Sequence, residues 1–190
     1  MYSARFEEAV TTMLEAHGLN QRKAGRGFEA SHAFSVATIV ADHGFAEDTV
    51  IAALLHDTLE DTDLDPAVIE RRFGVLVLDM VRDVSEPPMP RRWRDRKLTY
   101  IEQLRTSVRH GSHAVAAADK IHNLSKMTEG LQAHGPTYIR PFTAPVEDMI
   151  WYHQTVVDTL RATWDHPILI EQAHRLDSFI EAAAGARTLS

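Results

Sequence analysis

Helical spacing of apolar residues is the feature that most limits the fold of this chain, because it runs through almost the whole sequence. Phe6, Val10 and Met13 form one such stripe within residues 3–17. The alternation that indicates β-strands is nearly absent, and segments rich in glycine and proline separate the periodic ones. We therefore predict an all-α protein in which residues 1–190 form a single domain.

Capping and breaking residues set the bounds of the predicted helices. Ser31 has a side chain suited to an N-cap, and Asp65 precedes a proline at the first position of a helix that Gly74 ends. The proline-rich segment 86–90 is the clearest break in the chain. The predicted helices cover residues 3–17, 31–43, 47–60, 66–73, 75–84, 91–106, 112–132, 145–163 and 167–183.

The apolar run Val50–Leu55 ends in ionisable residues. His56 and Asp57 follow it directly, and Glu60 and Asp61 come one turn later. On a helix, Glu60 lies four residues after His56, and the same spacing separates the two aspartates, so neighbouring turns stack these groups on one edge. Such groups are costly to bury unless they bind something. Because the chain has no cysteine, we expect a divalent cation held by imidazole and carboxylate ligands.

Two further segments carry residues of the same kind. His32 lies upstream of the apolar run, within the helix that we predict over 31–43. Asp119, His122 and Asn123 occupy positions i, i+3 and i+4 of another predicted helix, so they share a face. We expect His122 to pack, or to support a ligand, rather than to be one. Spacing alone leaves open whether these segments meet.

A resemblance to a known family joins these segments. The order His…His-Asp…Asp is similar to the ligand pattern of the HD superfamily of metal-dependent phosphohydrolases. Four blocks in the right order resemble the Rel/SpoT-type hydrolase domains and the stand-alone small hydrolases of the alarmone (p)ppGpp: HGLNQRKAGRGFEASHAFSVA, AALLHDTLEDT, ERRFGVLVLDMVRDVSE and AADKIHNLSKM. The blocks cover about residues 10–130, whereas the C-terminal helices, about 145–184, match weakly. The resemblance implies an HD-type helical bundle.

The resemblance also implies a role for each matching residue. Glu60 and Asp61 would orient and deprotonate the attacking water. Arg22 and Lys23 would hold the nucleobase and phosphate side of the substrate, and Asn123 would contact the sugar. The metal, typically Mn²⁺ in this family, would be held by His32, His56, Asp57 and Asp119. The implied reaction converts ppGpp or pppGpp to GDP or GTP plus pyrophosphate. Lys120 and Lys126 are candidates to offset negative charge that develops in the reaction.

Three positions depart from the family pattern at or beside the expected substrate pocket. Ala33 stands where proline often follows the first histidine, Ala24 where a small hydroxyl residue often follows the Arg-Lys pair, and Lys126 where a small or polar residue is common. These departures leave open an HD-type phosphatase that acts on another phosphorylated nucleotide, such as NADP(H) or a nucleoside monophosphate. Loss of a ligand or of the paired acids would have favoured a non-catalytic nucleotide sensor, but all of these residues are present.

Charge and composition limit the partners. The formal net charge of −7 argues against a general nucleic-acid binder. The basic run 91–97 is interpreted as a solvated helix face or an oligomer contact, so a homo-oligomer stays open. No apolar stretch is long enough to cross a bilayer, and the N-terminus lacks a secretion pattern. We expect a cytoplasmic protein with a small nucleotide as its substrate and neither a membrane nor a nucleic acid as a partner.

Overall fold

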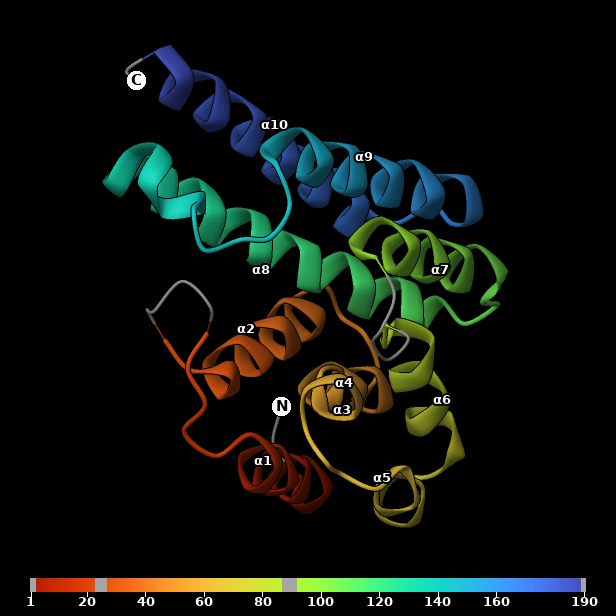
Figure 1. Cartoon of the computed structure of the whole chain (residues 1–190). Coiled ribbons are helices and arrows are strands. Elements are labelled where there is room, and N and C mark those ends of the chain that lie inside the picture. Colours follow the sequence, from red (N-terminus) through yellow and green to blue (C-terminus); the bar gives the residue numbers. More distant parts are fainter. Residues whose placement is uncertain (1–2, 23–26, 87–91, 189–190) are drawn as a thin grey trace.

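The computed structural model describes residues 3–22, 27–86 and 92–188, and it is built from helices (Figure 1). Within these residues the strand-like pairing is limited to one isolated antiparallel bridge, between Gln21 and Phe28. The elements are α1 (Ala4–His17), α2 (Glu29–Asp42), α3 (Glu47–Leu55), α4 (Thr58–Asp61), α5 (Pro66–Phe73), α6 (Val75–Val84), α7 (Trp93–Thr106), α8 (His110–His134), the 3₁₀ helix η1 (Gly135–Ile139), α9 (Val146–Thr163) and α10 (Pro167–Thr188). The prediction of an all-α fold is confirmed.

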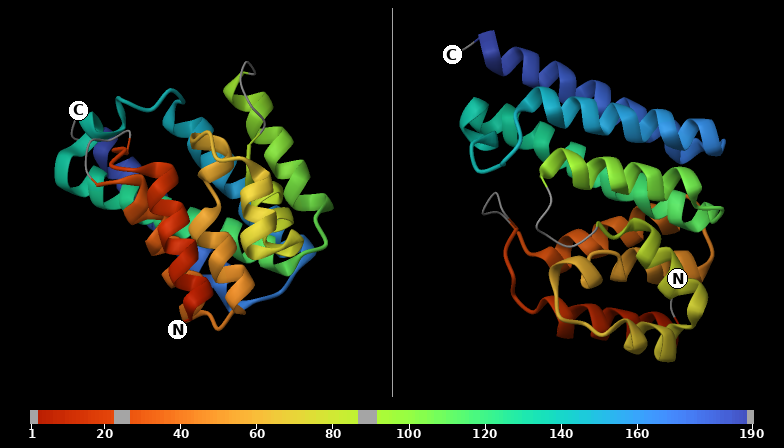
Figure 2. Two further views of the ribbon diagram at one scale, coloured as in Figure 1. Left: turned by 90° about the horizontal axis from the view of Figure 1, so that it is seen from below. Right: turned by 45° about the vertical axis from the view of Figure 1, so that its right-hand side comes forward.

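Helix α8 links the two halves of the molecule. Its 25 residues run between α2 and α3 on one side and α9 and α10 on the other (Figure 1). The first half of α8 contributes Val115 and Ile121 to a core shared with α1, α2, α3, α5 and α6. The second half contributes Leu124 and Leu131 to a second cluster shared with α9 and α10. Figure 2 shows these layers from two further directions, with α7 to α10 stacked above α1, α2 and α3 in its right-hand view.

Helix α2 begins earlier than the sequence indicates. Phe28, and not Ser31, is its N-cap, and no side chain caps the helix at this point. The backbone of the preceding loop takes over the capping. Glu29 donates its N–H to Asn20 O at 2.9 Å, and Arg22 donates its N–H to Gly27 O at 3.1 Å. Because this pairing satisfies an N–H group of the first turn, a capping hydroxyl is unnecessary.

The predicted helix over residues 47–60 is interrupted at His56 and Asp57. The structure has α3 before these two residues and the short α4 after them. Side chains hydrogen-bond to carbonyl groups that backbone N–H groups would bind in a continuous helix. Nδ1 of His56 lies 2.8 Å from Ala53 O, and the Thr58 hydroxyl donates to Leu55 O at 2.6 Å. The predicted continuous helix is therefore divided in two, although Asp61 still donates its N–H to Asp57 O at 2.9 Å, as in a helical turn. The interruption places His56 and Asp57 in a turn beside α8.

The remaining helices lie close to their predicted bounds. Residue 91, where we predicted the start of a helix, lies outside the described residues, and α7 begins at Trp93. Helix α10 continues to Thr188, beyond the predicted end at residue 183. In the described part of the chain, no helix is long and apolar enough to span a membrane.

Candidate active site

Four side chains from three parts of the chain converge beside α8. His32 Nε2, from α2, lies 3.4 Å from Asp57 Oδ2 and 3.2 Å from Asp119 Oδ1. His56 Nε2 lies 3.1 Å from Asp57 Oδ1 and 3.9 Å from Asp119 Oδ1. One ligand atom from each of His32, His56 and Asp119 falls within a group 4.8 Å across, which is suited to a metal ion. The structure thus brings together the four side chains that the family resemblance implies as ligands.

The protonation of His56 shows that this group needs a positive charge. Its Nδ1 must carry a proton, because the Ala53 carbonyl that it faces can only accept. In a neutral ring, Nε2 then points a lone pair at carboxylate oxygens, and this buried atom has no hydrogen-bond partner. Burial disfavours the charged ring, but the Asp57 carboxylate outweighs burial and raises the pKa of His56 to about 9. Either a proton or a cation must therefore lie between these groups.

Asp119 is fixed through both of its carboxylate oxygens. Lys120 Nζ donates to Oδ2 at 2.5 Å, and Asn123 Nδ2 donates to Oδ1 at 2.5 Å. Burial disfavours the charge on Asp119, but the Lys120 ammonium and His32 hold its pKa well below the usual value. Burial is likewise outweighed at Asp57, where His56 and His32 lower the pKa. Both groups are therefore carboxylates at neutral pH.

The other ring nitrogen of His32 contacts a second histidine, His122, which lies on α8. Nδ1 of His32 lies 2.8 Å from Nδ1 of His122, and the two ring centroids are 4.8 Å apart. His122 follows Asp119 by three residues, so one face of α8 carries Asp119 and also contacts His32. Burial, and then the charges of His32 and Arg22, lower the pKa of His122 to about 3, so this ring is neutral.

Glu60 and Asp61, on α4, line the same cavity as Asp57. Glu60 Oε2 accepts a hydrogen bond from the backbone N–H of Glu86 at 3.1 Å. Burial, followed by the negative charges of Glu86 and Asp57, raises the pKa of Glu60 to about 7. A carboxylate with a pKa in this range can exchange a proton near neutral pH, which suits a general base.

The cavity beside these residues has a volume of about 1000 Å³. It is at the upper end of the range for small-molecule sites, about 300–1,000 Å³. Despite the net negative charge of the chain, the described lining includes cations from α7, α8 and the loop before α2: Arg22, Arg96, Lys97, Lys120 and Lys126. Each of these cations is paired with a carboxylate that also lines the cavity, so the lining carries both signs and offers an anionic ligand local positive positions rather than a net positive charge.

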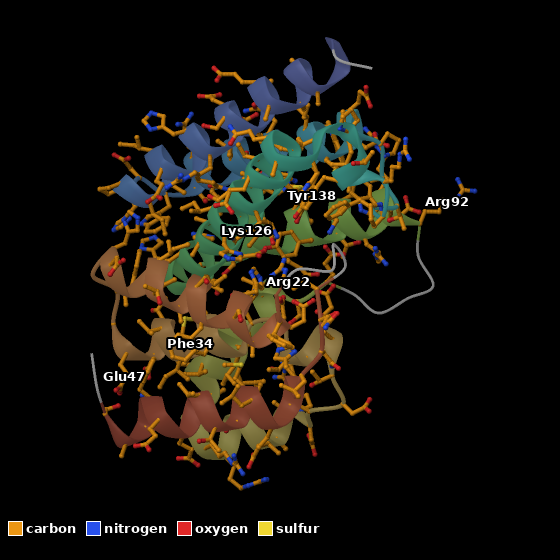
Figure 3. The ribbon with its side chains drawn as sticks, turned by 90° about the vertical axis from the view of Figure 1, so that its left-hand side faces the viewer. Arg22, Phe34, Glu47, Arg92, Lys126 and Tyr138 are labelled. Carbon is orange, nitrogen blue, oxygen red and sulfur yellow. The ribbon has the colours of Figure 1, made fainter. Side chains whose placement is uncertain are left out.

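The two described residues that we expected to contact substrate are tied to each other. Arg22 Nη2 donates to Asn123 Oδ1 at 2.7 Å, and Nη1 lies 3.7 Å from Glu29 Oε2. Asn123 in turn donates to Asp119, so a chain of hydrogen bonds leads from Arg22 to the candidate metal group. Arg22 lies on the same side of the molecule as Lys126 and Tyr138, which also line the cavity (Figure 3). Lys23 lies outside the described residues.

The two lysines proposed to offset charge have different surroundings. Lys120 is buried, and its Nζ lies 4.7 Å from the centroid of the Tyr100 ring. Lys126 is half exposed and binds Glu129 at 2.7 Å. Both line the cavity, but Lys120 is the one bonded to Asp119.

Helix α7 provides two cavity-lining cations that our sequence reasoning missed. Lys97 binds Glu86 and lies 4.6 Å from the centroid of the Tyr152 ring, and Arg96 Nε lies 3.4 Å from Glu86 Oε2. Both cations line the cavity, so the interpretation of the whole run 91–97 as a solvated face was wrong for these two. A signal was present in the sequence, because Trp93, Lys97 and Tyr100 share one helical face.

Comparisons with known proteins place the chain among HD-domain proteins. A family model described as "HD domain" matches residues 9–140. The guanosine-3′,5′-bis(diphosphate) 3′-pyrophosphohydrolase of Aquifex aeolicus is 39% identical over 85 residues, which are 45% of this chain but 12% of that protein. The enzyme of the same name, MESH1, from Drosophila melanogaster is 30% identical over 165 residues, covering 85% of this chain and 87% of the relative.

The similarity extends to a solved structure along nearly its whole length. That protein is described as a metazoan ortholog of SpoT that hydrolyzes ppGpp and plays a role in starvation responses. It has a TM-score of 0.76 and 27% sequence identity, covering 95% of this chain and 96% of the other. The C-terminal helices, which match weakly in sequence, are therefore part of the shared fold.

Proposed function

This chain belongs to the HD domain family, and from that premise we propose that it hydrolyses ppGpp and pppGpp to GDP or GTP plus pyrophosphate. Relatives and a solved structure whose names or descriptions refer to ppGpp hydrolysis support the proposal, because they match most of this chain. The observation that carries it is the buried His–His–Asp group, which lies at a cavity lined by cations and by an acid whose pKa is near 7.

The residues present fit a divalent cation. The Nε2 atom of His56 is buried without a hydrogen-bond partner and faces carboxylate oxygens. A cation between the Nε2 lone pair and these oxygens would be attracted by both. The ligands that we propose are His32, His56, Asp57 and Asp119. Nitrogen and carboxylate ligands suit Mn²⁺, which is the metal that we propose. When bound, the cation acts as a Lewis acid and lowers the pKa of a bound water.

The protein residues then handle the proton and the substrate. Glu60 accepts a proton from the attacking water, and Asp61 orients that water. The water oxygen bonds to the phosphorus attached to O3′, the bond from that phosphorus to O3′ breaks, and O3′ takes up a proton. The products are pyrophosphate and GDP, or GTP from pppGpp. General-base assistance of this kind typically contributes about 10²–10⁴-fold in rate.

The cations of the cavity bind and orient the anionic substrate. Lys97 and Lys120 lie on the side of the cavity formed by α7 and α8, where they offset phosphate charge. Arg22 and Lys23 hold the nucleobase and phosphate side, and Asn123 contacts the sugar. Arg22 and Asn123 are hydrogen-bonded to each other, and this bond orients the two side chains relative to one another.

An HD-type phosphatase on another phosphorylated nucleotide is the second candidate, and one observation favours it. Of the three departures from the family pattern, Lys126 lines the cavity. Ala33 is buried in the core directly after His32, a cavity-lining residue, so it lies beside the cavity without lining it, and Ala24 lies outside the described residues. A lysine at position 126 adds a positive charge that could bind a further phosphate.

Product analysis distinguishes the two candidates. The protein is incubated with Mn²⁺ and, separately, with ppGpp, pppGpp, NADPH and nucleoside monophosphates, and the products are separated by anion exchange. We expect GDP and intact pyrophosphate from ppGpp. Orthophosphate from another nucleotide, with ppGpp untouched, would transfer the function to the second candidate.

A further inference from the structure

We propose that His122 is a positioning residue for His32: it accepts the hydrogen bond that fixes which nitrogen of His32 carries the proton. The proposal rests on the proposed function, since it takes His32 as a metal ligand. The two Nδ1 atoms lie 2.8 Å apart, and the His32 ring is buried with 2% of its surface exposed. A buried ring with few partners depends strongly on each one that it has.

The direction of this hydrogen bond follows from what lies on the other side of His32. Its Nε2 faces Asp57 and Asp119, where a ligand must present a lone pair. A neutral imidazole carries one proton, so that proton must be on Nδ1 of His32. His122 Nδ1 must then accept, and the proton of the His122 ring must be on its Nε2. The two histidines can therefore serve the site in only one combination of tautomers.

His56 shows what makes this arrangement unusual. Its Nδ1 donates to the carbonyl of Ala53, a backbone group that can only accept and that no substitution removes. His32 depends instead on a side chain, and on one that is itself able to donate. Partners of this kind orient a ligating histidine, and their loss typically lowers metal affinity by about 10–100-fold. The position of His32 is therefore open to mutational test, whereas that of His56 is not.

The fold explains why α8 supplies this partner. Asp119 and His122 are three residues apart on one face of α8, and α8 packs against α2, which carries His32. A single helix face thus provides one proposed ligand and holds the second in orientation. A shift of α8 relative to α2 would disturb both contacts together.

The test is metal affinity measured without substrate. We compare Mn²⁺ binding by the wild-type protein, His122→Phe and His122→Asn, using calorimetry or competition with a fluorescent chelator. Phenylalanine keeps a ring but removes the acceptor, so we expect binding about 10–100-fold weaker. Asparagine restores an acceptor oxygen, so we expect it to recover most of the affinity. His134→Phe is the matched control, since His134 lies on the same helix, lines the same cavity and makes no contact with the four proposed ligands among the interactions that the structure describes.

Nitrogen-15 NMR of the imidazoles in the wild-type protein loaded with a diamagnetic divalent cation, such as Zn²⁺, provides a second measurement that needs no variant to fold. We expect the proton of the His122 ring on Nε2, which leaves its Nδ1 to accept from Nδ1 of His32. Two results would overturn the role of His122. One is a His122→Phe protein that binds Mn²⁺ as tightly as the His134→Phe control, and the other is a His122 ring with its proton on Nδ1. A wild-type protein that binds no metal would instead overturn the proposed function.

Discussion

The raised pKa of Glu60 leads to a direct prediction about the proposed base. The ordinary pKa of a glutamate is 4.5, and here burial, Glu86 and Asp57 raise it to about 7. A carboxyl group is charged only above its pKa, so the ability of Glu60 to accept a proton is lost as the pH falls through 7. In the metal-free protein, roughly one tenth of Glu60 is ionised at pH 6 and about nine tenths at pH 8.

Carbon-13 NMR of glutamate-labelled, metal-free protein measures this pKa, and Glu60→Gln assigns the resonance. Glu86→Gln should move the midpoint to lower pH, because it removes the negative charge that ranks after burial as a cause of the shift. Glu171→Gln removes one negative charge in the same way and serves as the control, because Glu171 binds His43 and Arg175 on another surface. It should leave the midpoint of Glu60 unchanged. A wild-type midpoint near 4.5, or one unaffected by Glu86→Gln, would refute this reasoning.

Three further variants test the remaining roles. His56→Ala should abolish Mn²⁺ binding and turnover together, and calorimetry that finds stoichiometric metal in the variant would contradict its place among the ligands. Glu60→Gln combined with Asp61→Asn should keep the metal and lose about 10²–10⁴-fold in kcat, whereas a rate within a few-fold of the wild type would disprove the base assignment. Arg22→Ala removes a guanidinium that we propose to contact the substrate, and a hydrogen bond from a charged group is worth about 1.5–3 kcal/mol, so KM for ppGpp should rise roughly tenfold or more. An unchanged KM in a folded protein would exclude Arg22 from substrate binding.

The sequence predicted the helices better than the details of their ends. Apolar periodicity was sufficient for an all-α fold, because most helices bury one face in a core that α8 shares. Two of the missed ends are decided by distant or buried groups. The start of α2 depends on a backbone pairing with Asn20, and the break after α3 depends on His56 turning back to Ala53.

The candidate site was predictable in its members but not in its arrangement. Spacing identified the ionisable turn at 56–61, and the family resemblance joined it to His32 and Asp119. The bond between His32 and His122 joins α2 to α8, so helical spacing on either helix does not reveal it. Arg96 and Lys97 were misread because a basic run does not show which of its members face inward. A single domain over residues 1–190, a homo-oligomer and a cytoplasmic location stay predictions.

The most direct test of the central claim is the fate of the water oxygen. The protein, loaded with Mn²⁺, is given ppGpp in water enriched in oxygen-18, and the products are examined by phosphorus-31 NMR and mass spectrometry. Attack at the phosphorus attached to O3′ predicts one labelled oxygen in pyrophosphate and unlabelled GDP. Labelled orthophosphate, or ppGpp that stays intact while another nucleotide is hydrolysed, would contradict the proposed reaction.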